Sequence, residues 1–316
     1  MKHLVFVLVG VLCVASTSAM AGDVLFADNF DDDTSADWNI IATADTSYEF
    51  GFDYSEIGVP PSPNGGGSTF GLRMAANIVD PEGAEAITFS PMGQSFSGHY
   101  TLTFDVWINA NGPFPGGGGG STEFYTAGIG YDNATVNQGG ATGSGGWFAA
   151  TGEGGSSRDY RGYKDAGEQF AESGQFFAGM SSAGGGAHNA SDPYYAQFGS
   201  IDVEVAVPDQ ASEYDQQIGV TGAGSQGFEW HEVVITMNGA TALWEIDGLP
   251  IAELDPTIGE AFDLDGNISI GYMDIFGSVS DNPDLSFGLV DNLVVTPEPG
   301  TVLLLAIGGL ALRRRR

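Results

Sequence analysis

Short runs of β-branched and aromatic residues, separated by Gly, Asn, Asp and Pro, recur from Gly22 to Thr296. No stretch of useful length repeats its apolar residues every 3.6 positions, as an amphipathic helix does. The pattern predicts an all-β fold, a β-sandwich or jelly roll, because such folds consist of many short strands joined by turns. The expected strands are Val24–Phe26, Gly71–Ala76, Ala86–Phe89, Tyr100–Ile108, Phe124–Ile129, Asp202–Val207, His231–Met237, Ala242–Ile246, Ile268–Met273 and Leu289–Val295.

The clearest local signals are one alternating strand and two hairpins. In Tyr100–Ile108, the apolar side chains fall on one face and most polar ones on the other, as a half-buried strand requires. Farther along, Asn238-Gly239 and Asp247-Gly248 separate three β-rich runs between Trp230 and Ala252. Both dipeptides supply the positive φ of tight turns, so we expect two successive hairpins.

The stretch from 109 to 200 is looser, with glycine runs at 116–120, 139–146, 152–155 and 184–186. The chain holds 49 Gly, but also 20 Phe, 11 Tyr and 5 Trp, enough to fill a core. We interpret 109–200 as long loops at one edge of a single β-sandwich body spanning 22–296. Loops on a rigid scaffold commonly carry binding residues.

The hairpin sequence from Trp230 to Leu254 also resembles the corresponding hairpins of concanavalin A-like, laminin-G-like sandwich domains. In those domains a Trp-His-x-Val strand precedes a strand that ends in Asp-Gly, as Trp230, His231, Val233, Asp247 and Gly248 do here. The resemblance implies a concanavalin A-like sandwich. It leaves function open, because that fold occurs in lectins, glycan hydrolases and protein binders.

The first 21 residues are expected to be a secretory signal peptide. A basic start at Lys2 is followed by an apolar run from Leu4 to Ala15, and Ala19 and Ala21 suit cleavage before Gly22. The run is too short for a mature membrane-spanning helix, which needs about 20 residues. The single cysteine, Cys13, lies inside this segment, so the exported body has no disulfide.

The last 20 residues form a second targeting segment. Pro297-Glu298-Pro299 precedes an apolar stretch from Val302 to Leu312, expected to be a hydrophobic helix, and the chain ends in Arg313, Arg314, Arg315 and Arg316. The arginines are expected on the cytoplasmic side of the membrane. On physical grounds the segment is a tail anchor or a sorting signal, and both place the body outside the cytoplasm.

This arrangement resembles the PEP-CTERM proteins of bacteria. The resemblance implies export, transient or stable anchoring in the inner membrane by the C-terminal helix, and processing by an exosortase. The expected partners are therefore the export machinery and an exosortase, and the expected location is the cell surface, cell envelope or extracellular matrix.

Charge excludes another class of partner. Five of the nine basic residues lie in the two end segments, so the body, counted from Gly22 to Glu298, has four basic residues against 41 acidic ones, a net charge of −37. Such a surface repels nucleic acid and anionic lipid and attracts divalent cations. Solubility in salty water explains the same composition.

Acidic residues at both ends of the body suggest a structural Ca²⁺ site. Asp28 follows the first strand and Asp291 lies in the last, and the first and last strands of sandwiches are commonly close. Ca²⁺ takes carboxylate, amide and carbonyl oxygens as ligands. Solvated charge that caps turns is the alternative. The segment Asp263–Asn267 resembles the start of an EF-hand calcium loop. Asp274 occupies the twelfth position, where an EF-hand needs glutamate, so an ordinary turn is favoured.

A second candidate site combines basic and aromatic residues. Tyrosine faces stack on sugar rings and guanidinium groups hold carboxylates or sulfates, so this set predicts binding of an acidic polysaccharide. The alternative is that the basic groups pair with Glu153, Asp159 and Asp165 while the tyrosines pack beneath them. The candidate ligand-binding residues are Trp147, Arg158, Tyr160, Arg161, Tyr163 and Lys164.

Catalytic motifs are weak. Glu245-Ile246-Asp247 begins like the Glu-x-Asp-x-x-Glu signature of sandwich-fold glucanases, but Pro250 replaces the second glutamate. We therefore expect a non-enzymatic carbohydrate-binding module. A structural, calcium-bridged acidic surface or biofilm protein is the alternative, and a degenerate glycan hydrolase is the third hypothesis.

Overall fold

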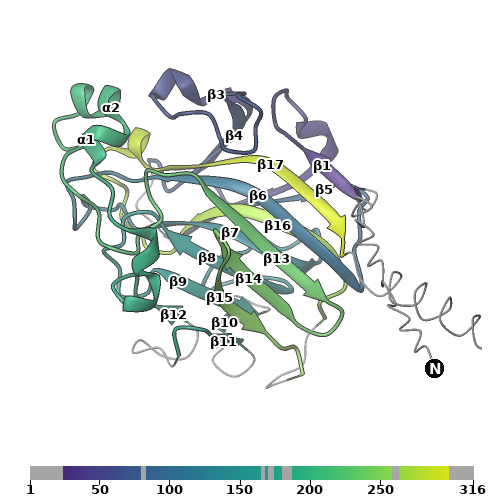
Figure 1. The fold of residues 1–316 in the computed structure, drawn as a ribbon. Helices are drawn as coiled ribbons and strands as arrows, with labels where there is room; N and C mark the ends of the chain where they lie inside the picture. The colour runs from purple at the N-terminus through teal and green to yellow at the C-terminus, as the bar shows by residue number, and fades with distance from the viewer. Residues whose placement is uncertain are drawn as a thin grey trace, which may run out of the picture.

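The computed structural model describes residues 24–79, 83–164, 168–169, 174–179, 187–257 and 263–298. Within them, two antiparallel sheets face each other across one core (Figure 1). This confirms the predicted β-sandwich. The expected signal peptide, the hydrophobic tail and the four terminal arginines lie outside the described residues.

Sheet A has nine strands in the described chain. In spatial order they are β11 (Gly174–Phe176), β15 (Leu249–Leu254), β14 (Ala242–Ile246), β13 (His231–Asn238), β6 (His99–Asn109), β17 (Phe287–Pro297), β4 (Phe70–Ala76) and β3 (Thr46–Asp53), with β1 (Phe26–Asp28) also paired to β17.

Sheet B has eight strands in the same ranges. They are β10 (Glu168–Gln169), β9 (Tyr160–Lys164), β8 (Gly146–Thr151), β7 (Glu123–Tyr131), β16 (Asn267–Asp274), β5 (Glu85–Pro91) and β2 (Trp38–Ala42), with β12 (Ala187–His188) also paired to β9.

The alternation predicted for Tyr100–Ile108 is observed in the first half of β6, whereas the second half is buried on both faces, with Asp105 and Trp107 at most 1% exposed. Leu102, Phe104 and Val106 are at most 1% exposed and contribute to the core between the sheets. From β14 of the same sheet, Trp244 stacks on Phe148 of β8, with ring centroids 5.0 Å apart. Apolar burial on both inner faces therefore holds the two sheets together.

Both predicted hairpins are confirmed. Strands β13 and β14 pair from Val233–Ile246 to Met237–Ala242, and Gly239 between them has φ +85°. Strands β14 and β15 are joined by Asp247 and Gly248, whose φ values are +49° and +72°. Two consecutive positive φ angles are what a two-residue turn of right-handed twist needs.

Within 109–200, the predicted strand Phe124–Ile129 is confirmed as part of β7. The expectation of long loops is wrong where β8 and β9 continue sheet B beside it. Some of the glycines there are packing residues. At Gly128 in β7, an added Cβ would lie 2.6 Å from the Cβ of Trp147 on the neighbouring strand. Glycine in this region therefore permits close strand packing as well as turns.

The predicted strand Asp202–Val207 is also wrong, because this segment forms helix α1 (Val203–Ala206), followed by α2 (Pro208–Glu213). Val203 and Val207, four residues apart, are buried on one side of the helix, whereas Val205 is 75% exposed. Pro208 at the start of α2 suits a helix N-terminus and not a strand interior.

Helices α1 and α2 and the 3₁₀ turn η2 (Tyr54–Ile57) lie over one end of sheet A, at the upper left of Figure 1. They bury outward-facing residues of the sheet, including Trp107 and Leu289, in a second apolar cluster. None of the helices in the described ranges is long and apolar enough to cross a membrane. The edge of this cluster is where a cavity opens.

Candidate ligand cavity

Arg73, on the outer face of β4, is the centre of the cavity. Its guanidinium lies between two aromatic rings, 5.3 Å from the Phe52 centroid and 5.0 Å from the Phe287 centroid. The side chain is only partly exposed, and its Nε atom is buried without a hydrogen-bond partner. Within the described chain, ion pairs shorter than 4.0 Å involve only His188 and His231, so no carboxylate pairs directly with this guanidinium.

The cavity around Arg73 has a volume of about 330 Å³. Its floor is aromatic and aliphatic, and its rim is acidic. The other lining residues are Phe52, Glu56, Ile57, Asp209, Gln210, Glu213, Tyr214, Asp284, Leu285 and Phe287. This volume lies at the lower end of the range of about 300–1,000 Å³ that is typical of small-ligand sites.

A buried amide holds the roof of the cavity in place. Gln210 of α2 donates from Nε2 to the Ile57 carbonyl at 3.0 Å and to Asn109 Oδ1 at 3.1 Å. Its Oε1 accepts a hydrogen bond from Gln217 at 3.3 Å. These contacts join α2 to η2 and to the end of β6, so a helix of only six residues keeps a defined position.

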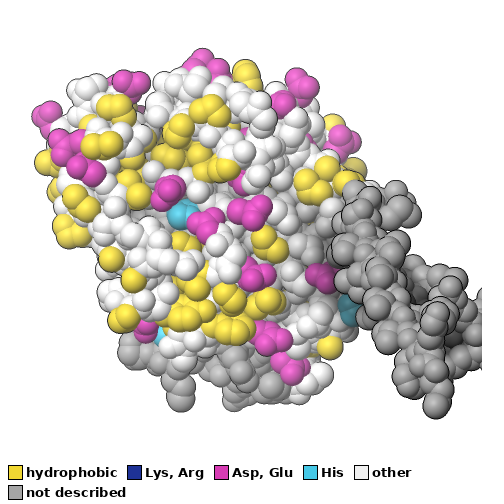
Figure 2. Space-filling view, in the orientation of Figure 1, with side chains coloured by type: hydrophobic (Ala, Val, Ile, Leu, Met, Phe, Trp, Pro, Cys, Tyr) yellow, Lys and Arg dark blue, Asp and Glu magenta, His cyan; other side chains and the backbone are white. Residues whose placement is uncertain are grey.

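The electrostatics of the cavity are mixed. Burial lowers the pKa of Arg73, while the nearby Asp284 and Glu49 carboxylates act to raise it. The four carboxylates on the rim outnumber the single guanidinium, and acidic side chains are spread over the visible face of the molecule (Figure 2). The site therefore offers one strong donor group within a field of hydrogen-bond acceptors.

The prediction that Trp147, Tyr160 and Tyr163 stack on a sugar is wrong, because all three side chains are buried. Trp147, Tyr160 and Tyr163 are at most 1% exposed. Trp147 stacks on Tyr163 at 4.1 Å, and Tyr160 stacks on Tyr195 at 4.1 Å. Because these ring faces are packed against protein, they offer no surface to a sugar ring.

The basic residues of the same segment lie in different surroundings. Arg161 is buried over the Phe124 ring at 4.4 Å, and its Nε donates to the Arg158 carbonyl at 2.7 Å. Burial raises the pKa of Glu153 to about 7 and that of Asp159 to about 6, and the charge of Arg161 only partly opposes this. Arg158 and Lys164 are half-buried, and a role for them in binding stays a prediction.

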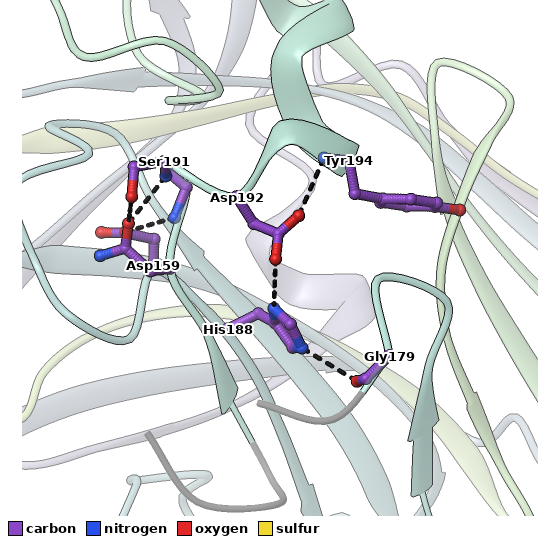
Figure 3. A network of polar contacts seen from close by, with 8 residues as sticks. Asp159, Gly179, His188, Ser191, Asp192 and Tyr194 are labelled. Carbon is purple, nitrogen blue, oxygen red and sulfur yellow. Dashed lines mark hydrogen bonds and ion pairs between the residues drawn. The ribbon is translucent and has the colours of Figure 1, made fainter. Parts of the chain in front are cut away.

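A polar network fixes the loop that covers this segment (Figure 3). His188 Nε2 lies 3.0 Å from the Gly179 carbonyl oxygen, and its Nδ1 lies 3.8 Å from Asp192. Asp192 also accepts a hydrogen bond from the Tyr194 amide at 2.9 Å. These contacts hold the loop between β12 and η3 (Pro193–Phe198) against β9, so the network is structural.

The first and last strands of the sandwich pair as predicted, because β1 lies beside β17 with Asp28 opposite Leu293. Both carboxylates are already hydrogen-bonded to protein donors. Asp28 accepts from the Phe30 amide, Thr34 and Trp38, while Asp291 accepts from Tyr54, Ser62 and the Asn292 amide. Burial raises the pKa of Asp291 to about 6. Calcium at this pair stays a prediction.

The two possible catalytic carboxylates do not act as a pair. Glu245 projects from the outer face of β14, and burial raises its pKa. Asp247 lies in the turn and accepts from the Glu232 amide at 2.8 Å, with its other oxygen 2.7 Å from His231 Nδ1. Burial acts to raise the pKa of Asp247, but the His231 contact and the amide hydrogen bond lower it. Asp247 therefore has a role in the turn.

The first residues of the sorting segment are attached to the sandwich. Pro297 ends β17 opposite Tyr100, and the Glu298 amide donates to the His99 carbonyl at 3.3 Å. Thr101 donates to the Glu298 carboxylate at 3.1 Å. Pro299 and Arg313, Arg314, Arg315 and Arg316 lie outside the described residues.

Sequence reasoning did not identify the Arg73 cavity. Its lining residues come from three segments, 52–57, 209–214 and 284–287, which no local spacing connects. One signal was available: Arg73 is the only lysine or arginine between Lys2 and Arg158. A lone cation inside an expected strand of so acidic a chain marks a position worth attention.

Comparisons with known proteins identify the C-terminal segment. Residues 295–316 match the PEP-CTERM protein-sorting motif. The match confirms the predicted sorting signal, which indicates an exported protein and membrane-associated sorting. No curated protein matches the chain.

Solved structures with similar folds include proteins of several kinds. A Bacillus subtilis protein of unknown function with a galectin-like fold is 12% identical, with 88% of this chain and 97% of that chain covered and a TM-score of 0.44. The carbohydrate-binding module CBM66 of Bacillus subtilis is 7% identical (82% and 95% covered, TM-score 0.38). A glycoside hydrolase family 16 endo-glucanase from Bacteroides ovatus is 12% identical (86% and 100% covered, TM-score 0.42). At this level of similarity, neither ligand nor chemistry is transferred.

Proposed function

We propose that this exported protein binds a neutral polysaccharide in the Arg73 cavity without cleaving it. The observation that supports the proposal is the half-buried guanidinium, held between two rings and without an ion-pair partner in the described chain. A buried charge without a hydrogen-bonded partner is costly, so a ligand oxygen at this position would be favourable.

The lining residues match the chemistry of a sugar. Hydroxyl groups of a sugar donate to carboxylates such as Glu56, Asp209 and Asp284, while the guanidinium donates to hydroxyl or ring oxygens. Phe52 and Tyr214 provide apolar surface for the C–H face of the ring. The four rim carboxylates and the body charge of −37 disfavour an anionic polysaccharide here.

Replacement of Arg73 is expected to weaken binding strongly. A charge-assisted hydrogen bond contributes about 1.5–3 kcal/mol, so Arg73→Gln should lower the affinity for a bound neutral glucan or galactan about 10- to 100-fold. Arg73→Lys retains the charge but loses the planar guanidinium, so its affinity should lie between those of wild type and Arg73→Gln. Affinity electrophoresis in gels containing neutral polysaccharides, followed by calorimetry with the oligosaccharide that is retained, measures this.

Arg158→Gln is the matched control, because it removes the same charge outside the cavity. Polygalacturonate should be retained weakly or not at all. Equal affinity of wild type and Arg73→Gln, or no retention by any neutral polysaccharide, would contradict the proposal. Release of reducing ends from the bound polysaccharide would show hydrolysis and reject a purely binding role.

A further inference from the structure

A buried, oxygen-rich chamber lies between the sheets, on residues outside the Arg73 cavity. Glu123 of β7 and Asp274 of β16 are opposite each other on adjacent strands. Each is two positions from a core tyrosine, Tyr125 or Tyr272, so both side chains point toward the inside of the sandwich. Glu123 is 3% exposed and Asp274 is 1% exposed.

Four buried oxygen atoms around this pair have no hydrogen-bond partner. They are Glu123 Oε2, Asn77 Oδ1, Tyr272 OH and Ser286 Oγ. Asn77 is tied to the site, since its Nδ2 donates to Asp274 Oδ2 at 2.8 Å and to the Phe276 carbonyl at 3.2 Å. Buried polar groups without partners are rare in native proteins, so several in one place indicate a missing ligand.

The two carboxylates have nearby hydrogen-bond donors but no cationic partner among the described residues. Asp274 accepts at both oxygens, from Asn77 Nδ2 and, at 2.7 Å, from the Phe276 amide. In the described chain no lysine or arginine forms an ion pair with either carboxylate. Burial, and next the charge of Asp274, raise the pKa of Glu123 well above its ordinary value. The Tyr272 and Ser286 hydroxyls are close enough to act on this carboxyl, yet neither makes a hydrogen bond of normal geometry with it. Protonation with trapped water, or a bound cation, would resolve this arrangement.

We propose that the chamber binds a divalent cation, calcium by its donor set, between Glu123 and Asp274, with Ser286 Oγ as a neutral ligand. All available donors are oxygens, which favours a hard cation over zinc or copper. Calcium suits an irregular shell better than Mg²⁺, which demands near-ideal octahedral geometry. The site is separate from the Asp28–Asp291 pair and does not depend on the proposed polysaccharide binding.

The number of charged ligands sets the expected affinity. In the described residues no three Asp, Glu, His or Cys side chains converge, so the chamber offers two carboxylates and otherwise neutral oxygens. Calcium sites of extracellular modules bind with dissociation constants of about 10⁻⁴–10⁻³ M, and low ligand charge favours this weak range.

Thermal unfolding of the full-length protein tests the site. At pH 8, 10 mM CaCl₂ should raise the Tm of wild type by about 5 °C, and EGTA should reverse the rise. Glu123→Gln and Asp274→Asn should each abolish the rise. Without calcium, Glu123→Gln should be at least as stable as wild type, because it removes a buried charge. Asp274→Asn also loses one of two accepted hydrogen bonds and should be somewhat less stable. Mg²⁺ at the same concentration should produce a smaller shift.

Asp28→Asn and Asp291→Asn are the matched controls and should retain the calcium response. A response lost in these two variants but kept in Glu123→Gln would place the ion at the joined chain ends and overturn the proposal. No calcium response in wild type, together with no calcium bound after equilibrium dialysis, would mean that the chamber holds protons and water only.

Discussion

Tyr160→Ala is expected to destabilise the protein by about 4 kcal/mol, in the range of large-to-small aromatic substitutions in cores. The ring is fully buried, stacks on Tyr195 at 4.1 Å and lies 6.2 Å from the Trp244 ring. Its hydroxyl donates to the Gly224 carbonyl at 2.5 Å and accepts from Gln226 Nε2 at 3.0 Å. The substitution therefore leaves both a cavity and two unpaired polar groups.

Urea unfolding of wild type, Tyr160→Phe and Tyr160→Ala measures this loss. Tyr160→Phe retains the packing and should cost only about 1–2 kcal/mol, the contribution of the hydroxyl contacts. Phe177→Ala, at an aromatic side chain 48% exposed, is the control and should change stability by no more than about 0.5 kcal/mol. If Tyr160→Ala unfolded like wild type and bound polysaccharide more weakly, the ring would be a ligand contact after all.

The contrast between expected and observed roles of Tyr160 has a physical cause. Sequence alternation reports a strand with one wet face, which is why β6 and the hairpins β13–β14–β15 were predictable. Strand β8 reads Trp-Phe-Ala-Ala without alternation, because both of its faces are buried. Phe148 faces the core between the sheets, and Trp147 belongs to a separate apolar cluster against which Val136 packs. A strand covered on both faces has no polar side for sequence to reveal.

The candidate site was less predictable than the fold for a related reason. Turn residues such as Asp247 and Gly248 act within a few positions, so their effect is visible locally. Arg73 acquires its surroundings only when Phe52 and Phe287, more than 200 positions apart, pack on either side of it. In the same way, Glu123 and Asp274 become neighbours only through the pairing of β7 with β16.

The folded protein is expected to lose stability as the pH rises from 5 to 8, with Glu153 as one main cause. This carboxyl is 1% exposed, and burial, together with the charge of Asp159, raises its pKa to about 7. In the unfolded chain, glutamate has a pKa of about 4.3. The native state therefore keeps a proton that the unfolded state has lost. The stabilisation is complete below the unfolded pKa and disappears as the pH passes through 7.

Glu153→Gln should flatten this dependence. The difference between an ordinary pKa of 4.5 and one of about 7 corresponds to a stability change on the order of 3 kcal/mol across the transition. Glutamine is neutral at every pH. Glu153 has two hydrogen-bond partners, the Gly155 amide and the Thr122 hydroxyl, and a glutamine side chain can accept from the first with its oxygen and face the second with its NH2 group. The variant should therefore match wild type near pH 5 and exceed it at pH 8.

Urea unfolding at pH 5, 6, 7 and 8 distinguishes the effect of the buried Glu153 from a general effect of net charge on stability. Asp159, whose pKa burial raises to about 6, keeps titrating in the variant and should leave a smaller slope at lower pH. Glu204→Gln, at an exposed position of α1, removes the same charge from the surface and should leave the wild-type slope intact. If Glu153→Gln and Glu204→Gln changed the pH dependence equally, net charge alone would govern it, and burial of Glu153 would have no measurable effect.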